Sequence, residues 1–249
     1  MLKAVSIPIS RTISRYSKLI SSSCDRFGSF RGPLQSPANL TKRKLVTDLK
    51  SQTRFSSSAN TMAKSALVLI ADGSEEMEFV ITVDVLRRAN INVVAASVNS
   101  AGPHIECSRG INIVPDLPLD EAIKKGPYDI IILPGGLKGA ETFAKDAHVG
   151  KLLQQFEKEG KKVAAICAAP TALKQHGVFK ETKLTSYPSF KDELSAGGYP
   201  YSDDNVVVSG NLITSKGPST AFEFALQIVE ELEGAEAASN VAKGLLLPR

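Results

Sequence analysis

The sequence predicts an α/β fold in which a mostly parallel β-sheet carries helices on both faces. From residue 66 onward, short runs of β-branched and other apolar residues alternate with amphipathic stretches of helical period. Continuous apolar strands indicate a sheet that is covered on both faces, and regular alternation of strand and helix indicates parallel crossovers. A chain of 249 residues with 43% hydrophobic residues suits one such domain with an added tail.

The elements can be justified in chain order. Buried strands are predicted where apolar runs are bounded by turn residues, at Ala66–Ala71, Ile91–Val98, Asp129–Leu133 and Val163–Ile166. Helices are predicted between them, at Glu76–Asn90, Leu119–Lys125, His148–Glu159 and Ala168–His176. Two hairpins are expected, at Ile105–Val114, broken at Ser108-Arg109-Gly110, and at Val206–Ser215, turning at Gly210-Asn211. A last helix is predicted to begin at Pro218 and to bury Phe222, Ala225, Leu226, Val229 and Leu232 on one face.

The net charge of +4 combines two segments of opposite sign. Residues 1–63 carry 11 lysines and arginines against two acids, whereas residues 64–249 carry 19 against 24. The folded domain is therefore expected to be acidic, which argues against direct DNA binding. No apolar run reaches the roughly 18 to 20 residues of a membrane span, so no membrane association is expected.

Residues 1–63 have the composition of a mitochondrial transit peptide, with 13 serines and isolated acids. Apolar residues from Ile9 to Ile20 recur at helical spacing opposite basic ones, and Arg54-Phe55-Ser56-Ser57 is similar to a presequence processing site. A disordered tail without an address is the alternative. An internal start at Met62 would give a second form in the cytoplasm.

Three loops at the carboxyl ends of predicted strands carry the candidate chemistry, because ligands of open α/β sheets bind there. Cys167 follows one strand among small residues and precedes a helix, whose dipole would favour the thiolate. Gly135 and Gly136 follow another strand, where backbone N–H groups, with that of Ala168, would bind an oxyanion. The alternatives are a packed cysteine and an ordinary βα turn.

The third loop is acidic, Asp72-Gly-Ser-Glu-Glu-Met-Glu78. Acids at a helix start stabilise the helix, and this accounts for Glu75 and Glu76. Glu78 falls one turn further in, on a partly buried face, where a carboxyl tends to stay protonated and can donate to a thiolate.

These segments resemble the DJ/PfpI superfamily, in its protein-deglycase branch. The resemblance covers residues 64–247 and rests on five motifs: residues 66–71, Glu75-Glu-Met-Glu78, Leu133-Pro-Gly-Gly136, residues 164–173 around Cys167, and Thr214-Ser-Lys-Gly-Pro218. It implies a flavodoxin-like fold of the class I glutamine amidotransferase type and a homodimer. It also implies Cys167 as an oxidation-sensitive nucleophile, Glu78 as its protonated partner, and Gly136 with Ala168 as the oxyanion hole.

The same resemblance places Arg88 and Arg109 near the cysteine, where they would hold an anion, and makes Cys107 a second thiol open to redox modification. A packed structural role is the alternative for Cys107. One position departs from the family, because its histidine aligns with Tyr187, and a tyrosine with a pKa near 10 is a poor base at neutral pH. Neither a cofactor nor a metal site is expected, because the three cysteines lack ligand spacing.

Two functions are compatible with these residues. The first is a cofactor-free, cysteine-dependent deglycase or glyoxalase that acts on methylglyoxal, glyoxal and their adducts with proteins and nucleotides, and protects against oxidative stress. The second is a non-enzymatic redox sensor and chaperone, in which oxidation of Cys167 to the sulfinate alters the binding of client proteins.

Overall fold

The computed structural model describes residues 63–100 and 102–248 of the chain. Within them, seven strands form one sheet in the order β5-β2-β1-β6-β7-β9-β8, parallel except where β8 pairs with β9. The strands are β1 (Ser65–Ile70), β2 (Asn92–Ser97), β5 (Leu117–Pro118), β6 (Ile130–Leu133), β7 (Lys162–Ile166), β8 (Val206–Ser209) and β9 (Leu212–Ser215). A separate antiparallel pair is formed by β3 (Ile105–Glu106) and β4 (Asn112–Ile113).

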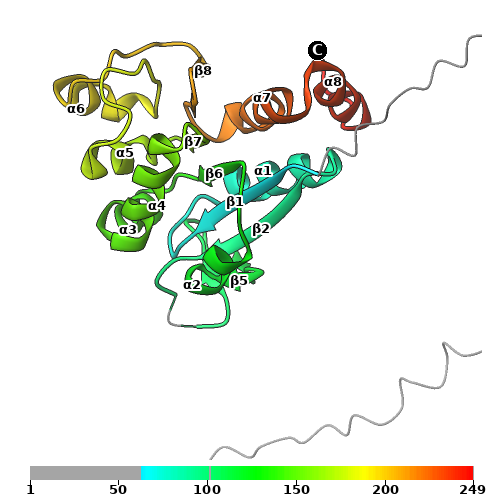
Figure 1. Ribbon diagram of the computed structural model, residues 1–249, viewed down its shortest axis with the longest axis horizontal. Helices are drawn as coiled ribbons and strands as arrows, with labels where there is room; N and C mark the ends of the chain where they lie inside the picture. Colours follow the sequence, from blue (N-terminus) through cyan, green and yellow to red (C-terminus); the bar gives the residue numbers. More distant parts are fainter. Residues whose placement is uncertain (1–62, 101, 249) are drawn as a thin grey trace, which may run out of the picture. The chain divides into compact units, whose positions relative to one another are not determined.

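Helices cover both faces of the sheet, as the sequence predicts (Figure 1). One face packs against α1 (Glu76–Arg88), α7 (Ala221–Glu233) and α8 (Ala235–Gly244). The other packs against α2 (Leu119–Ala122), α3 (Leu137–Lys145), α4 (Ala147–Lys158), α5 (Pro170–His176) and α6 (Lys191–Ala196). Alternate residues of β1 serve the two layers: Val68 packs in the first and Leu67 in the second.

The predicted strands and both hairpins are confirmed, with bounds that move by only one or two residues. Three helices, α3, α6 and α8, were not predicted. The first of them starts directly after Gly136, where the paired glycines predict a loop. Among the described residues, no helix is long and apolar enough to cross a bilayer.

The predicted buried face of the last helix is wrong in one residue. A short 3₁₀ turn occupies Pro218–Thr220, and the α-helix begins only at Ala221. Phe222 is 38% exposed, whereas Phe224 is fully buried. Phe224, Ala225, Ile228 and Val229 are all fully buried, so the face of α7 that reaches the sheet is centred further toward Phe224 than predicted.

Candidate functional site

The three loops singled out in the sequence meet at the carboxyl edge of the sheet. The order of the strands places β6 between β1 and β7, so the loop after β6 runs between the other two. A Cβ atom at Gly135 would lie 2.5 Å from Cβ of Cys167 and 2.7 Å from Oε2 of Glu78. Only glycine fits there, which confirms that these loops come together.

Cys167 occupies a strained turn between β7 and α5. Its φ of 64° lies in the left-handed region, which costs a non-glycine residue about 1–3 kcal/mol. Two backbone hydrogen bonds hold the turn: its N–H donates to the Ser215 carbonyl at 2.9 Å, and its carbonyl accepts from the Tyr187 N–H at 2.8 Å. The sharp turn predicted for a reactive cysteine is therefore present.

Glu78 is a buried carboxyl beside the thiol. It is fully buried, and its Oε2 accepts a hydrogen bond from the Gly135 N–H at 2.7 Å. Burial raises the pKa of Glu78 to about 8, against the opposing effect of that N–H, and the nearby charge of Glu75 raises it further. Glu78 is therefore a carboxylic acid at neutral pH, as predicted.

The predicted preference of Cys167 for the thiolate is not supported. Burial raises the pKa of Cys167 to about 12, and the charge of Glu78 contributes to this rise. The backbone N–H groups of Gly136 and Ala168 act in the opposite direction but are outweighed. The helix α5 begins three residues after the cysteine, at Pro170. Because the effect of a helix dipole falls off with distance, α5 stabilises the Cys167 thiolate only weakly. Burial therefore favours the protonated form of the thiol as well as of the carboxyl.

Of the three backbone N–H groups predicted to bind an oxyanion, one donates to Glu78 and two interact with the Cys167 side chain. The Gly135 N–H is already used by Glu78, because a buried carboxyl needs a donor, so the prediction that Gly135 binds substrate is wrong. The N–H groups of Gly136 and Ala168 both interact with the Cys167 side chain. Gly136 has a φ of 84°, a conformation that glycine adopts without strain.

The two arginines are not brought to the thiol together. Arg88 lies in the last turn of α1, ten residues or about 15 Å from Glu78, and its Nε pairs with Asp84 at 2.7 Å. Arg109 lines a cavity of about 650 Å³ to which Cys167 does not contribute. Within one chain, Arg88 thus lies at the end of α1 opposite to Glu78. Anion binding by Arg88 or Arg109 stays a prediction.

Glu76 has a structural role that the sequence analysis missed. It is 4% exposed, and its carboxylate accepts hydrogen bonds from the Ser108 hydroxyl at 2.7 Å and the Arg109 N–H at 2.8 Å. Burial opposes ionisation, but these and other backbone hydrogen bonds together hold the pKa of Glu76 below its ordinary value. Its carboxylate therefore ties the β3–β4 hairpin to α1. The sequence feature that could have indicated this role is the pair of adjacent acids at the start of α1. Glu75 alone caps the helix, so Glu76 is free to bind another segment.

Cys107 lies on that hairpin and is 4% exposed. Burial raises the pKa of its thiol to about 11, and the charges of Glu76, Glu75 and Asp72 add to the effect. This environment agrees with the packed structural role, the alternative that the sequence left open.

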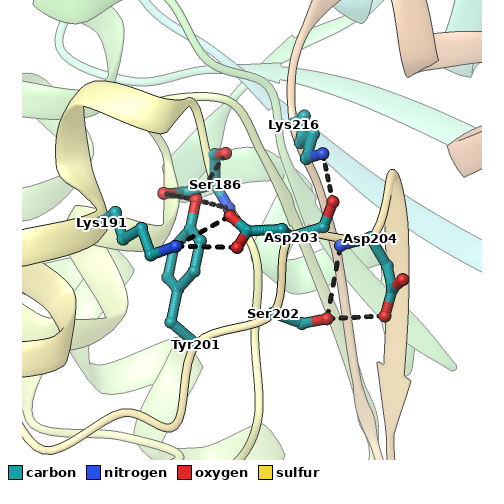
Figure 2. A network of polar contacts seen from close by, with 7 residues as sticks. All are labelled: Ser186, Lys191, Tyr201, Ser202, Asp203, Asp204 and Lys216. Carbon is teal, nitrogen blue, oxygen red and sulfur yellow. Dashed lines mark hydrogen bonds and ion pairs between the residues drawn. The ribbon is translucent and has the colours of Figure 1, made fainter.

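A polar network supports the loop that contacts the nucleophile (Figure 2). The Tyr201 hydroxyl donates to the Ser186 carbonyl at 3.0 Å and accepts from the Ser186 N–H at 3.2 Å. Lys191 lies 5.3 Å above the Tyr201 ring and pairs with Asp203 at 2.8 Å. The residue after Ser186 is Tyr187, whose N–H donates to the Cys167 carbonyl. By fixing the backbone of Ser186, Tyr201 therefore stabilises the strained turn at Cys167 indirectly.

Neither His148 nor His176 lies where it could replace the histidine that the resemblance implies at Tyr187. Tyr187 lies in the segment between α5 and α6, and its side chain is exposed, without a hydrogen bond from its hydroxyl among the described contacts. His176 bonds to the Phe143 carbonyl at 2.8 Å, and His148 approaches Asp120 at 3.5 Å, both away from the thiol. The described residues also contain no cluster of three or more potential metal ligands.

Comparison with known proteins agrees with this geometry. The sequence pattern of the DJ-1/PfpI family matches residues 64–231, more than half of the chain. The chain belongs to the DJ-1/PfpI family. Protein dj-1beta of Drosophila melanogaster is 52% identical over 187 residues, which is 75% of this chain and 98% of that protein. The glutathione-independent glyoxalase DJR-1.2 of Caenorhabditis elegans is 45% identical over 75% of this chain and 98% of its own length.

Solved structures of DJ-1 proteins have a similar fold. The crystal structure of Drosophila melanogaster DJ-1beta has a TM-score of 0.73 at 51% identity and covers 76% of this chain and all of that one. Oxidized DJ-1 of Toxoplasma gondii has a TM-score of 0.70 at 38% identity, over 75% of this chain and all of that one. The flavodoxin-like fold implied by the resemblance is thereby confirmed.

Proposed function

We propose that this protein is a cysteine-dependent glyoxalase or deglycase that acts on methylglyoxal, glyoxal and their adducts with proteins and nucleotides. The observation that carries this proposal is Cys167 on a strained turn beside Glu78, which is kept protonated by burial. The relative named as a glutathione-independent glyoxalase supports the reaction class. Protection against oxidative stress follows from removal of reactive dicarbonyls.

The reaction with methylglyoxal begins when the Cys167 thiol adds across the aldehyde. The sulfur–carbon bond forms, and the carbonyl electron pair moves to oxygen, where the N–H groups of Gly136 and Ala168 stabilise it. The thiol proton ends on this oxygen and gives a hemithioacetal.

Glu78 then moves protons between the two substrate carbons. It donates its proton to the ketone oxygen and receives the hydrogen of the thiol-bearing carbon as a proton, which gives an enediol. Glu78 then gives a proton to the second carbon and takes up the hydroxyl proton of the thiol-bearing carbon, which becomes the carbonyl carbon of a thioester. One carbon is oxidised and the other reduced, so no outside oxidant is needed. Water hydrolyses the thioester to a 2-hydroxy acid and frees the thiol.

The test is the conversion of methylglyoxal to the 2-hydroxy acid by the wild type, Cys167→Ala and Cys107→Ala. We expect Cys167→Ala to lose activity, because it lacks the nucleophile, and Cys107→Ala to keep it, since Cys107 is packed away from Glu78. Equal activity of the two variants would contradict the proposal.

Redox sensing at the same cysteine is a second candidate, favoured by the difference in exposure between the two described thiols. Cys167 is partly exposed and Cys107 buried. The protonated carboxyl of Glu78 would donate a hydrogen bond to a sulfinate at Cys167, and the negative charge of the sulfinate would alter client binding. Mass spectrometry after mild peroxide is expected to find sulfinate at Cys167 first; earlier oxidation of Cys107 would exclude this function.

A homodimer is proposed from an apolar surface on α1 and the β3–β4 hairpin. Met77 and Val80 are 52% and 49% exposed, and Ile111 and Val114 are 55% and 76% exposed. Exposed apolar side chains on adjoining elements favour burial in an interface. Sedimentation equilibrium of the wild type and Val80→Asp tests it: a monomeric wild type, or a variant that still dimerises as tightly, would contradict this interface.

The segment 1–63 is proposed to direct the protein to mitochondria, with an additional cytoplasmic form initiated at Met62. The helix, the processing site, this start and Cys24 all lie outside the described residues, so the proposal rests on composition. N-terminal sequencing of the mature protein tests it. A start near Ser56 supports import, and an intact Met1 in the cytosolic fraction alone would refute it.

A further inference from the structure

One oxygen of Glu78 has no use in the described contacts. Oε2 accepts from Gly135, but Oε1 is buried and lacks a hydrogen-bond partner among the described residues. A buried polar atom without a partner costs about 1–3 kcal/mol, so such atoms in proteins commonly mark the place of a ligand or an ordered water. Since Oε2 already accepts the Gly135 N–H, Oε1 is the oxygen left to bind a substrate group.

Gly217 lies beside this oxygen and leaves space there. A Cβ atom at Gly217 would lie 3.9 Å from Oε1 of Glu78 and 3.5 Å from Cδ2 of Tyr187, both ordinary contacts. Its backbone is extended, with a φ of 165°, which any residue adopts. Unlike Gly135, Gly217 is thus required neither by its conformation nor by a collision with the protein. What glycine provides at this position is an unfilled, methyl-sized volume.

We propose that Gly217 determines which substrates fit, by keeping open the volume beside Glu78 in which the second oxygen of a 1,2-dicarbonyl compound is held. This proposal rests on the proposed function. The aldehyde oxygen meets the N–H groups of Gly136 and Ala168, while the neighbouring carbonyl oxygen accepts the hydrogen bond of Glu78 Oε1. The site therefore selects substrates with oxygens on adjacent carbons over simple aldehydes.

The test uses Gly217→Ala, with Gly244→Ala at the end of α8 as the matched control, because a Cβ at Gly244 meets no atom within 4 Å. Two rates are compared with the wild type: kcat/KM for methylglyoxal, and modification of Cys167 by methyl methanethiosulfonate, a thiol reagent without a carbonyl. We expect kcat/KM to fall about tenfold in Gly217→Ala, the effect of one lost hydrogen bond, with thiol modification unchanged. Gly244→Ala is expected to match the wild type in both.

Two results would overturn the proposal: full kcat/KM in a folded Gly217→Ala, or a parallel loss of thiol modification, which would show a disturbed Cys167 instead of a filled volume. Should Gly217→Ala not fold, the wild type gives the test. Propanal, which lacks the second oxygen, is expected to protect Cys167 from the reagent about tenfold less well than methylglyoxal. Equal protection would exclude the second-oxygen site. Protection without any turnover would support the binding site and contradict the proposed function.

Discussion

Replacement of Glu78 by glutamine is expected to remove a large pH dependence from the stability of this protein. The carboxyl is fully buried, and its pKa is raised from the ordinary value of 4.5 to about 8. Between these two pH values the native state holds a proton that the unfolded chain has released. Glutamine has a similar shape but cannot ionise, so Glu78→Gln retains the packing and loses the titration.

The size of the effect follows from proton linkage. The interval spans roughly 3.5 pH units, and each unit corresponds to about 1.4 kcal/mol, which gives about 5 kcal/mol. Because the folded-state pKa is raised, this stabilisation is complete below pH 4.5 and is lost as the pH rises through about 8. Relative to Glu78→Gln, the wild-type free energy of unfolding should therefore fall by about 1.4 kcal/mol per pH unit.

The assay is urea unfolding followed by circular dichroism, at fixed ionic strength and pH values between about 5 and 8. Both proteins carry Cys167→Ala, so that the thiol does not titrate or oxidise. Glu121→Gln, in α2, gives the effect of the same substitution at an exposed position. Curves of unfolding free energy against pH that run parallel for the parent and Glu78→Gln would refute a protonated Glu78.

Two further predictions use matched aromatic pairs. Phe224→Ala is expected to cost about 3–5 kcal/mol in urea unfolding, because Phe224 is fully buried, and Phe222→Ala less than about 1 kcal/mol; similar losses would contradict the observed helix face. Tyr201→Phe and Tyr199→Phe each remove a hydroxyl bonded to a backbone carbonyl and are expected to lower stability alike, by about 1–2 kcal/mol. Only Tyr201→Phe should slow methylglyoxal turnover through kcat and alter the alkylation rate of Cys167, and equal effects of the two variants would remove Tyr201 from the support of the site.

Much of the fold was predictable because its strands are continuous apolar runs. Residues 66–70 can only be buried on both faces, and this identifies a parallel sheet with helices on either side. The helix that starts at Leu137 was not predicted, because it follows Gly135 and Gly136 and contains Gly139. Closely spaced glycines are typical of a loop. Phe222 and Phe224 flank the apolar stripe of α7 on opposite sides, and periodicity alone does not show which of the two is buried.

The candidate site, like the fold, was predictable from the sequence only in part. Cys167 and Glu78 were predictable from position, because the turn after β7 and the first turn of the helix after β1 both lie at the carboxyl edge of the sheet. Their proton states were only half predictable, since burial acts on both groups and sequence does not report its depth. Glu76 was missed because its partners lie some thirty residues away on a hairpin, a distance that only the folded chain closes.

The central claim is that Cys167 forms a covalent bond with the dicarbonyl substrate. The most direct measurement is mass spectrometry of the protein quenched with acid during turnover of methylglyoxal, followed by peptide mapping. The predicted result is one substrate-derived adduct on the Cys167 peptide that appears with turnover and disappears when substrate is exhausted. Turnover that continues in Cys167→Ala, or without any adduct at Cys167 in the wild type, would contradict the claim.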